Sequence, residues 1–201
     1  MNSVLGSRCG RFTAGYLVLF GAVAAGRGDR RYVAYLLVVA ALGLALRRAH
    51  RTARFPTPLC GALAVCGLLH MSGGLLPSPS GAPVLYETWL VPGLVKYDQL
   101  VHFSISAVLT VAVWHLAGAW VDRRRCGPWA QAMLAVLVAL GFGALNEAFE
   151  FLSALRIPTF VGGADNTGWD LVFNGFGAVA AGVWLACSAV SPAPVAEGVP
   201  A

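Results

Sequence analysis

Three short stretches of the sequence carry paired ionisable or amide side chains at helical spacing. The members of each pair are three or four positions apart, so both lie on one face of a helix. The pairs are Asp98 and His102, Glu147 and Glu150, and Asp170 and Asn174. Carboxylates and an imidazole from several helices can hold a divalent metal ion. Closely spaced acids can also differ in protonation, so that one acts as a general acid and the other as a general base. These six residues are therefore the candidate catalytic residues, and a divalent metal is a candidate cofactor.

Two further residues are candidates for substrate binding. His70 lies in the preceding apolar segment at a similar depth, and Trp169 directly precedes Asp170. Both residue types also have structural roles in membrane proteins, because histidines hydrogen-bond neighbouring helices and tryptophans anchor helices at the membrane interface. Both interpretations stay open for these two residues.

The paired residues have a structural alternative as well. Buried polar side chains can link membrane helices through hydrogen bonds worth ~1 kcal/mol or less. Asp98 and Asp170 also occupy positions where an aspartate can cap a helix N-terminus. Glu147 and Glu150 fit this alternative poorly, because amides or serines would link helices at a lower cost. A charge in hydrocarbon costs ~2.5–3.5 kcal/mol on insertion scales, so two glutamates favour a functional site.

The composition indicates that lipid is the main solvent of the chain. Of its 201 residues, 58% are hydrophobic and 11% are charged, and the mean hydropathy is +0.71. A soluble domain carries roughly 25% charged residues. The net charge of +5 comes mainly from arginines in short segments between apolar stretches, which is how membrane topology is encoded. Nucleic-acid binding needs a basic face on a soluble surface, so we expect membrane lipids and no nucleic acid as partners.

The apolar stretches predict an all-α integral membrane protein, a bundle of about six transmembrane helices. A single transmembrane domain covers residues 1–190, and the Pro- and Ala-rich tail 191–201 is predicted to be disordered. The predicted spans are residues 12–26, 32–46, 58–76, 97–121, 128–153 and 169–190. The first two have about 15 residues against the ~20 that a membrane helix needs. They cross only if flanking arginines extend to the interface or the bilayer thins.

Arginine and lysine counts predict the orientation. Nine of the 14 lie at the N-terminus or in the segments after the second and fourth spans, and five lie on the other side. The positive-inside rule then places both termini in the cytoplasm of a multi-pass cell-membrane protein. The first span has an alternative as a signal peptide, because Arg8 and Arg11 precede an apolar stretch with Ala22-Val23-Ala24 as a small-residue cleavage site. We favour a retained anchor, since no soluble domain follows.

This orientation places the paired residues at one depth. From the outer ends of their spans, His102 lies ~8 Å deep, and Glu150 and Glu147 lie ~5 and ~9 Å deep. Asp170 lies at the rim of the sixth span, with Asn174 about one turn below. Because loops of different length produce this alignment, we expect the pairs to converge near the outer leaflet.

Two predicted outer loops are long, residues 77–96 and 154–168. Loops of this length in a compact bundle are usually lids, binding loops or disordered segments. The stretch from Asp165 to Asp170 is similar to part of a calcium loop but lacks the full ligand pattern with its final glutamate. We therefore expect an ordered turn there.

Three motifs in this order resemble known membrane families. They are Tyr97-Asp98-Gln99-Leu100-Val101-His102-Phe103, Asn146-Glu147-Ala148-Phe149-Glu150-Phe151 and Trp169-Asp170-Leu171-Val172-Phe173-Asn174-Gly175-Phe176-Gly177-Ala178. The chain is similar to the YjdF-type inner-membrane family of unknown function, which also tends to show a pattern like His70-Met71-Ser72-Gly73-Gly74, and more distantly to VanZ-like membrane proteins. The resemblance covers roughly residues 60–185 and implies an integral membrane protein with a polar cluster on its last helices. Glu150 stands where VanZ-like proteins commonly have a glutamine, which favours metal or acid–base chemistry over the VanZ phenotype.

These observations support three functional hypotheses. The first is a membrane-embedded enzyme, metal-assisted or acid–base, that acts on a lipid or lipid-linked headgroup at the outer leaflet. The second is a protein that binds or transports an ion, a proton or a polar headgroup. The third is a structural membrane scaffold in which the cluster only fixes helix packing. We prefer the first, because the inner halves of the last three spans offer few polar residues for a path across the membrane. The identity of the metal and the oligomeric state stay open.

Overall fold

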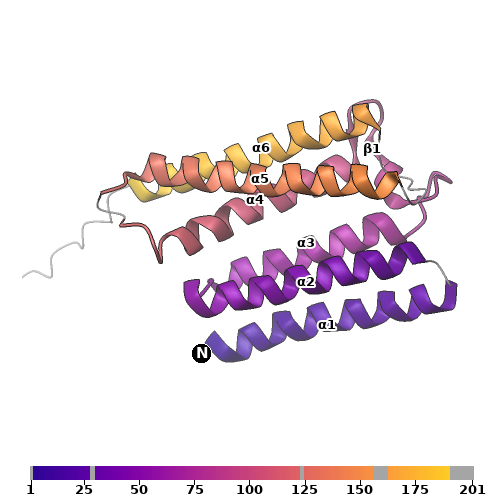
Figure 1. Cartoon of the computed structure of the whole chain (residues 1–201), viewed down its shortest axis with the longest axis horizontal. Helices are drawn as coiled ribbons and strands as arrows, with labels where there is room; N and C mark the ends of the chain where they lie inside the picture. Colours follow the sequence, from indigo (N-terminus) through magenta and orange to yellow (C-terminus); the bar gives the residue numbers. More distant parts are fainter. Residues whose placement is uncertain (1, 28–29, 123–124, 156–162, 191–201) are drawn as a thin grey trace, which may run out of the picture.

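In the computed structural model the chain forms a bundle of α-helices. The structure describes residues 2–27, 30–122, 125–155 and 163–190, and the predicted tail 191–201 lies outside them. The helices are α1 Asn2–Arg27, α2 Arg30–Ala53, α3 Thr57–Leu75, α4 Tyr97–Ala117, α5 Pro128–Ala154 and α6 Ala164–Val190. Figure 1 shows them running side by side along the long axis of the molecule, with α4, α5 and α6 on one side of α3 and with α1 and α2 on the other.

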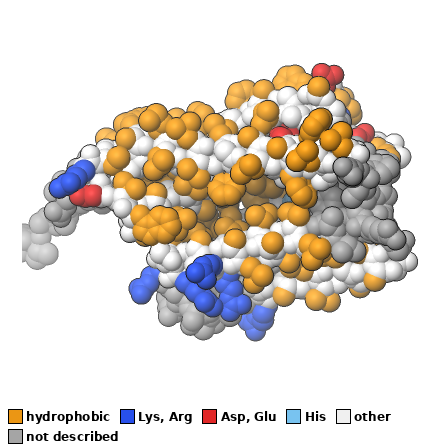
Figure 2. Space-filling view, in the orientation of Figure 1, with side chains coloured by type: hydrophobic (Ala, Val, Ile, Leu, Met, Phe, Trp, Pro, Cys, Tyr) orange, Lys and Arg blue, Asp and Glu red, His pale blue; other side chains and the backbone are white. Residues whose placement is uncertain are grey.

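Five helices in the described part of the chain are long and apolar enough to cross a membrane, which confirms the predicted all-α membrane fold. They are α3, α4, α5, α6 and the part of α1 from Arg8 to Gly26. Helix α2 is not among them, because its apolar stretch between Arg31 and Arg47 is too short. Figure 2 shows hydrophobic side chains along the sides of the helices and basic side chains gathered towards the end where α1 begins.

Several helix ends differ from the predicted span ends. The fourth span was predicted to reach residue 121, but α4 ends at Ala117. The amides of Ala119 and Trp120 bond to carbonyls three residues back, which closes the helix in a tighter turn. Helices α1 and α2 extend beyond the predicted spans 12–26 and 32–46. Hydropathy identifies only the apolar residues that can lie in the bilayer core. The helix can be longer, because it continues into polar residues outside the core.

The start of α6 is a further correction. The sixth span was predicted to begin at residue 169, but the helix begins at Ala164, directly after Gly163. Gly163 has φ 111°, a left-handed backbone conformation that favours glycine. The stretch from Asp165 to Asp170 is therefore the first part of a helix and not a separate turn. Its polar residues hid the helix, and residues 156–162 of the predicted loop lie outside the described ranges.

The predicted loop 77–96 is an ordered connection between α3 and α4. It contains the 3-10 helix η1 Leu85–Glu87 and an antiparallel hairpin of β1 Trp89–Val91 and β2 Val95–Lys96. Tyr86 is buried against α3, where its hydroxyl lies 2.6 Å from His70 Nδ1 and donates to the His70 carbonyl oxygen at 3.0 Å. A side chain at Gly73 would collide with the tyrosine ring, so this glycine lets the loop pack closely on the helix.

Helices α4, α5 and α6 approach one another closely at small residues. The most extensive helix contact in the described chain is between α4 and α6. A Cβ added at Gly177 of α6 would collide with the backbone carbonyl of Phe103 in α4, and one at Gly143 of α5 would meet the side chain of Asn174. Small residues permit this close approach between membrane helices. The faces that carry the paired polar residues are thereby pressed together.

Candidate functional site

His102 lies at the centre of a group of acids from three helices. Its Nε2 atom is 3.5 Å from Asp98 Oδ1, one turn earlier on α4, and 3.9 Å from Asp170 Oδ2 on α6. Its Nδ1 atom is 3.7 Å from Glu147 Oε1 on α5. Each edge of the imidazole thus faces a carboxylate, and Asp98 and Asp170 share the same edge.

Asp98 and Asp170, which we call the aspartate pair, are linked by Asn166. The Asn166 side-chain amide donates to Asp170 Oδ2 at 2.5 Å and to Asp98 Oδ2 at 3.2 Å. Asn166 lies in the first turn of α6, four residues before Asp170, so the helix itself places the amide over the carboxylate. The early start of α6 is what brings this residue to the site.

Glu147 and Glu150, which we call the glutamate pair, are linked in the same way by Asn146. The Asn146 amide donates to Glu150 Oε1 at 2.9 Å and lies 3.4 Å from Glu147 Oε1. All three residues belong to α5. Each acid pair is therefore bridged by one asparagine, and the His102 ring lies between the two pairs.

The acids are buried and incompletely partnered. Asp98, Glu147 and Asp170 are 4%, 4% and 1% exposed. Glu147 Oε2 and Asp170 Oδ1 have no hydrogen-bond partner in the described chain, and none of the lysines or arginines that the structure describes pairs with these carboxylates. A buried carboxylate without a counter-charge costs several kcal/mol, so the arrangement favours a positive species beyond the single imidazole.

Two sets of side chains in the described residues have the geometry to hold a metal ion. One set is Asp98, His102 and Asp170, and the other is His102, Glu147 and Glu150. Within each set one ligand atom per residue lies within 4.8 Å of the others. Carboxylate oxygens with one imidazole nitrogen suit hard or borderline divalent ions such as Mg²⁺, Mn²⁺ or Zn²⁺. His102 belongs to both sets and is therefore the residue that they share.

The remaining predicted site residues lie beside this cluster. Asn174 is buried one turn below Asp170, and its Oδ1 accepts a hydrogen bond from Ser106 at 2.6 Å. His70 contacts Tyr86 and belongs to neither metal-binding set. Trp169 is 56% exposed, and its ring packs against Phe173. The structure therefore gathers five of the predicted residues around one centre and places these three at its edge.

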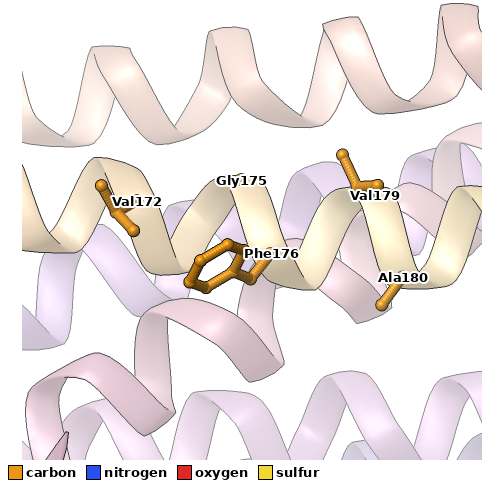
Figure 3. A pocket seen from close by; sticks show the side chains of 5 residues that line it. All are labelled: Val172, Gly175, Phe176, Val179 and Ala180. Carbon is orange, nitrogen blue, oxygen red and sulfur yellow. The ribbon is translucent and has the colours of Figure 1, made fainter. Parts of the chain in front are cut away.

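An apolar groove on α6 is separate from the cluster. It has a volume of about 590 Å³ and is lined by Val172, Gly175, Phe176, Val179 and Ala180. Figure 3 shows these residues along one stretch of α6. Their helical positions put them on the face opposite Asp170 and Asn174, which are buried. The groove faces the lipid-exposed side of the helix and contributes no polar group.

Sequence reasoning missed the two bridging asparagines and the contact of Tyr86 with His70. The asparagines have a visible signal, since Asn146 precedes Glu150 and Asn166 precedes Asp170 by one helical turn. That signal was hidden for Asn166 because its segment was expected to be a turn. Tyr86 lies in a segment without periodicity, so its packing against His70 had no counterpart in the sequence pattern.

Comparison with known proteins places the chain in a family without assigning a reaction. No curated protein and no solved structure matches it. Residues 11–190 match the family described as "Predicted membrane protein (DUF2238)". The YjdF-type resemblance is consistent with this match, whereas the VanZ-like resemblance is not shown by it. Since the match extends over most of its length, the chain belongs to this family of predicted membrane proteins.

Proposed function

We propose that this protein is a membrane-embedded enzyme in which the cluster around His102 holds a divalent metal ion and acts on the polar headgroup of a lipid. The observation that carries the proposal is that buried acids surround one imidazole, while two of their buried oxygens, Glu147 Oε2 and Asp170 Oδ1, have no hydrogen-bond partner in the described chain. A bound cation would offset the negative charge of the buried acids and accept lone pairs from carboxylate oxygens. If the cluster only linked the helices through hydrogen bonds, neutral polar side chains would suffice and four acids would not be needed.

The position of the cluster supports a headgroup as the substrate. Asp98 and Asp170 lie in the first two turns of α4 and α6, and Glu150 lies in the last turns of α5, so all belong to one end of the bundle. We place this end at the outer leaflet and both termini in the cytoplasm, since most arginines lie at the opposite end. Polar headgroups occupy this depth of a bilayer.

The chemistry follows from the donor set. A divalent ion polarises a phosphoryl or carbonyl oxygen and makes a bound water more acidic. His102 is 12% exposed and Glu150 is partly exposed, so one side of the cluster is accessible to a reactant. The remaining acids are buried, which strengthens their interaction with an ion.

Metal analysis of the purified protein tests the proposal. Full-length protein in detergent is loaded with Mn²⁺, desalted and analysed by mass spectrometry, and we expect about one ion per chain for a single mononuclear site. His102→Ala should lose the ion. Asp165→Asn removes an exposed acid near the site and should behave as wild type. Headgroup release from phospholipid vesicles should require the ion, and a wild-type protein that binds no divalent ion contradicts the proposal.

Ion transport is the second candidate function, and one observation favours it. Below the cluster, Ser106 and Thr110 are buried at successive turns of α4, and Thr110 donates to the Ser106 carbonyl oxygen at 2.8 Å. With Asn174 they form a polar line towards the middle of the bundle. The same Mn²⁺-binding protein in liposomes separates the two functions. Mn²⁺ uptake that is lost in Thr110→Val supports transport, whereas binding without uptake supports the enzyme.

A further inference from the structure

We propose that the two edges of the His102 imidazole divide the work of the site, so that the aspartate pair holds the metal and the glutamate pair handles the proton. This inference rests on the proposed function and assigns the role of each acid pair within it. A neutral imidazole binds a metal through one ring nitrogen and donates a hydrogen bond from the other, commonly to a carboxylate. His102 has a carboxylate on both edges, 3.5 Å from Nε2 and 3.7 Å from Nδ1. One edge therefore serves the metal and the other the proton.

Two carboxylates face the Nε2 edge of His102, whereas Glu147 is the one acid recorded against Nδ1 in the described chain. Asn166 hydrogen-bonds Oδ2 of both Asp98 and Asp170. Oδ1 of Asp98 is 3.5 Å from His102 Nε2, and Oδ2 of Asp170 is 3.9 Å from the same nitrogen. The other Asp170 oxygen, Oδ1, is buried without a hydrogen-bond partner in the described chain. One oxygen from each aspartate and one imidazole nitrogen thus lie within 4.8 Å of one another, close enough for one ion on the Nε2 edge.

The aspartate pair is also the more rigid of the two. Its members come from α4 and α6, whose backbones approach so closely that Gly177 has no room for a side chain against Phe103. Aspartate has one rotatable bond fewer than glutamate, and both aspartates are almost fully buried. A ligand set that is held in place before binding loses less conformational entropy when the ion arrives.

The glutamate pair has the features of a proton-handling group. Glu147 is buried and faces Nδ1, the ring edge that donates a proton when Nε2 binds a metal. Glu150 is one turn further along α5 and partly exposed, so the pair connects the buried ring edge with the accessible side of the site. Glu147 is therefore a positioning residue for His102, and Glu150 is placed to exchange protons with a reactant.

Hydrolysis of a headgroup ester illustrates the proton balance. The water oxygen forms a bond to the phosphorus or carbonyl carbon of the headgroup, and a water proton passes to a Glu150 carboxylate oxygen. The bond from that phosphorus or carbon to the leaving oxygen then breaks. The proton moves from Glu150 to the leaving oxygen, which returns Glu150 to its starting form.

Mn²⁺ titration of four isosteric variants tests the division. Full-length Asp98→Asn, Asp170→Asn, Glu147→Gln and Glu150→Gln are compared in detergent, with Asp165→Asn as control. The aspartate variants should bind Mn²⁺ ~100-fold or more weakly, because each replaces a negatively charged carboxylate ligand with a neutral amide. Glu147→Gln should lose about tenfold, as expected for a residue that orients a ligand. Glu150→Gln should bind within about threefold of wild type but lose headgroup release at saturating Mn²⁺.

Other outcomes overturn the inference in distinguishable ways. Two ions per chain, or equal weakening in Asp170→Asn and Glu150→Gln, overturns the division while leaving a metal site intact. Wild-type protein without Mn²⁺ binding overturns the proposed function and the division together. Size-exclusion profiles and melting temperatures identify any variant that fails to fold.

A spectroscopic signature covers the case in which an aspartate variant does not fold. Cu²⁺-loaded wild type and Glu147→Gln both retain the aspartate pair, and electron spin echo detects the imidazole nitrogen that is not bound to the metal. We expect its nitrogen couplings to change in Glu147→Gln, because that nitrogen is Nδ1 and loses a carboxylate acceptor. Unchanged couplings would contradict the assignment of Nδ1 to the proton edge.

Discussion

Asn166 and Asn146 occupy equivalent places, each holding two carboxylates with one amide group. An amide offers two N–H donors and carries no charge, so it can hold two acids together without neutralising them. This leaves the negative charge of each pair available to a cation or a proton. The asparagines thereby shape the site without competing for its ligand.

Replacing the two asparagines should have unequal effects on metal binding. In Asn166→Ala the aspartate pair loses its bridge, so we expect Mn²⁺ affinity to fall by roughly 10–100-fold, as for other residues that orient metal ligands. Asn146→Ala is the matched control, because it releases only the glutamate pair and should stay within a few-fold of wild type. Isothermal titration in detergent measures both. Unchanged affinity in Asn166→Ala would contradict the role of the bridge.

The individual residues of the cluster were largely predictable from the sequence, but their bridging partners were not. His102, Glu147 and Asp170 were found because acids and histidines are costly in lipid and stand out against an apolar background. Asn166 was missed because it lies in a polar segment, where a further polar residue does not indicate a functional site. The approach of Asn166 to Asp98 is tertiary, and periodicity along one helix does not encode it.

Among the elements, the contact between α4 and α6 decides whether the cluster exists. Asp98 and His102 reach Asp170 only because Gly177 brings the two backbones together one to two turns below. Helix α5 closes the third side, with Gly143 against Asn174. The contact between His102 Nε2 and Asp170 thus depends on Gly177, although this glycine has no reactive side chain.

A single methyl group at Gly177 should test that dependence. Gly177→Ala places a Cβ against the carbonyl of Phe103, so we expect overpacking to cost about 1–3 kcal/mol in the free energy of unfolding and to weaken Mn²⁺ binding. Gly175→Ala is the control on the same helix, since nothing lies within 4 Å of its added Cβ. Unfolding in mixed detergent micelles compares the two. Equal stability of both variants would contradict the close α4–α6 packing.

The elements themselves were predictable in existence but not in their ends. Apolar length predicted α3 and α5 to within one residue at each end, because lipid leaves little choice for an uncharged stretch of that size. The C-terminal end of α4 and the start of α6 depend on the local backbone at Gly118 and Gly163, which a hydropathy pattern does not predict. The same limitation hid the start of α6 and, with it, Asn166.

For the whole molecule, a membrane environment explains why a small chain can sustain such a site. Large apolar side chains such as Leu145, Phe149 and Trp184 are exposed on the helix sides, where lipid is their solvent. The polar residues are instead turned inward between α4, α5 and α6. The bundle therefore keeps its acids away from hydrocarbon and concentrates them at one end.

The most direct measurement is anomalous diffraction from crystals of the full-length protein soaked in Mn²⁺. We expect one strong peak about 2.0–2.6 Å from His102 Nε2 and from one carboxylate oxygen of each of Asp98 and Asp170. The peak should vanish in Asp170→Asn crystals. A map with no peak beside His102, or one in which the acids of α4, α5 and α6 point away from one another, would contradict a metal site at His102.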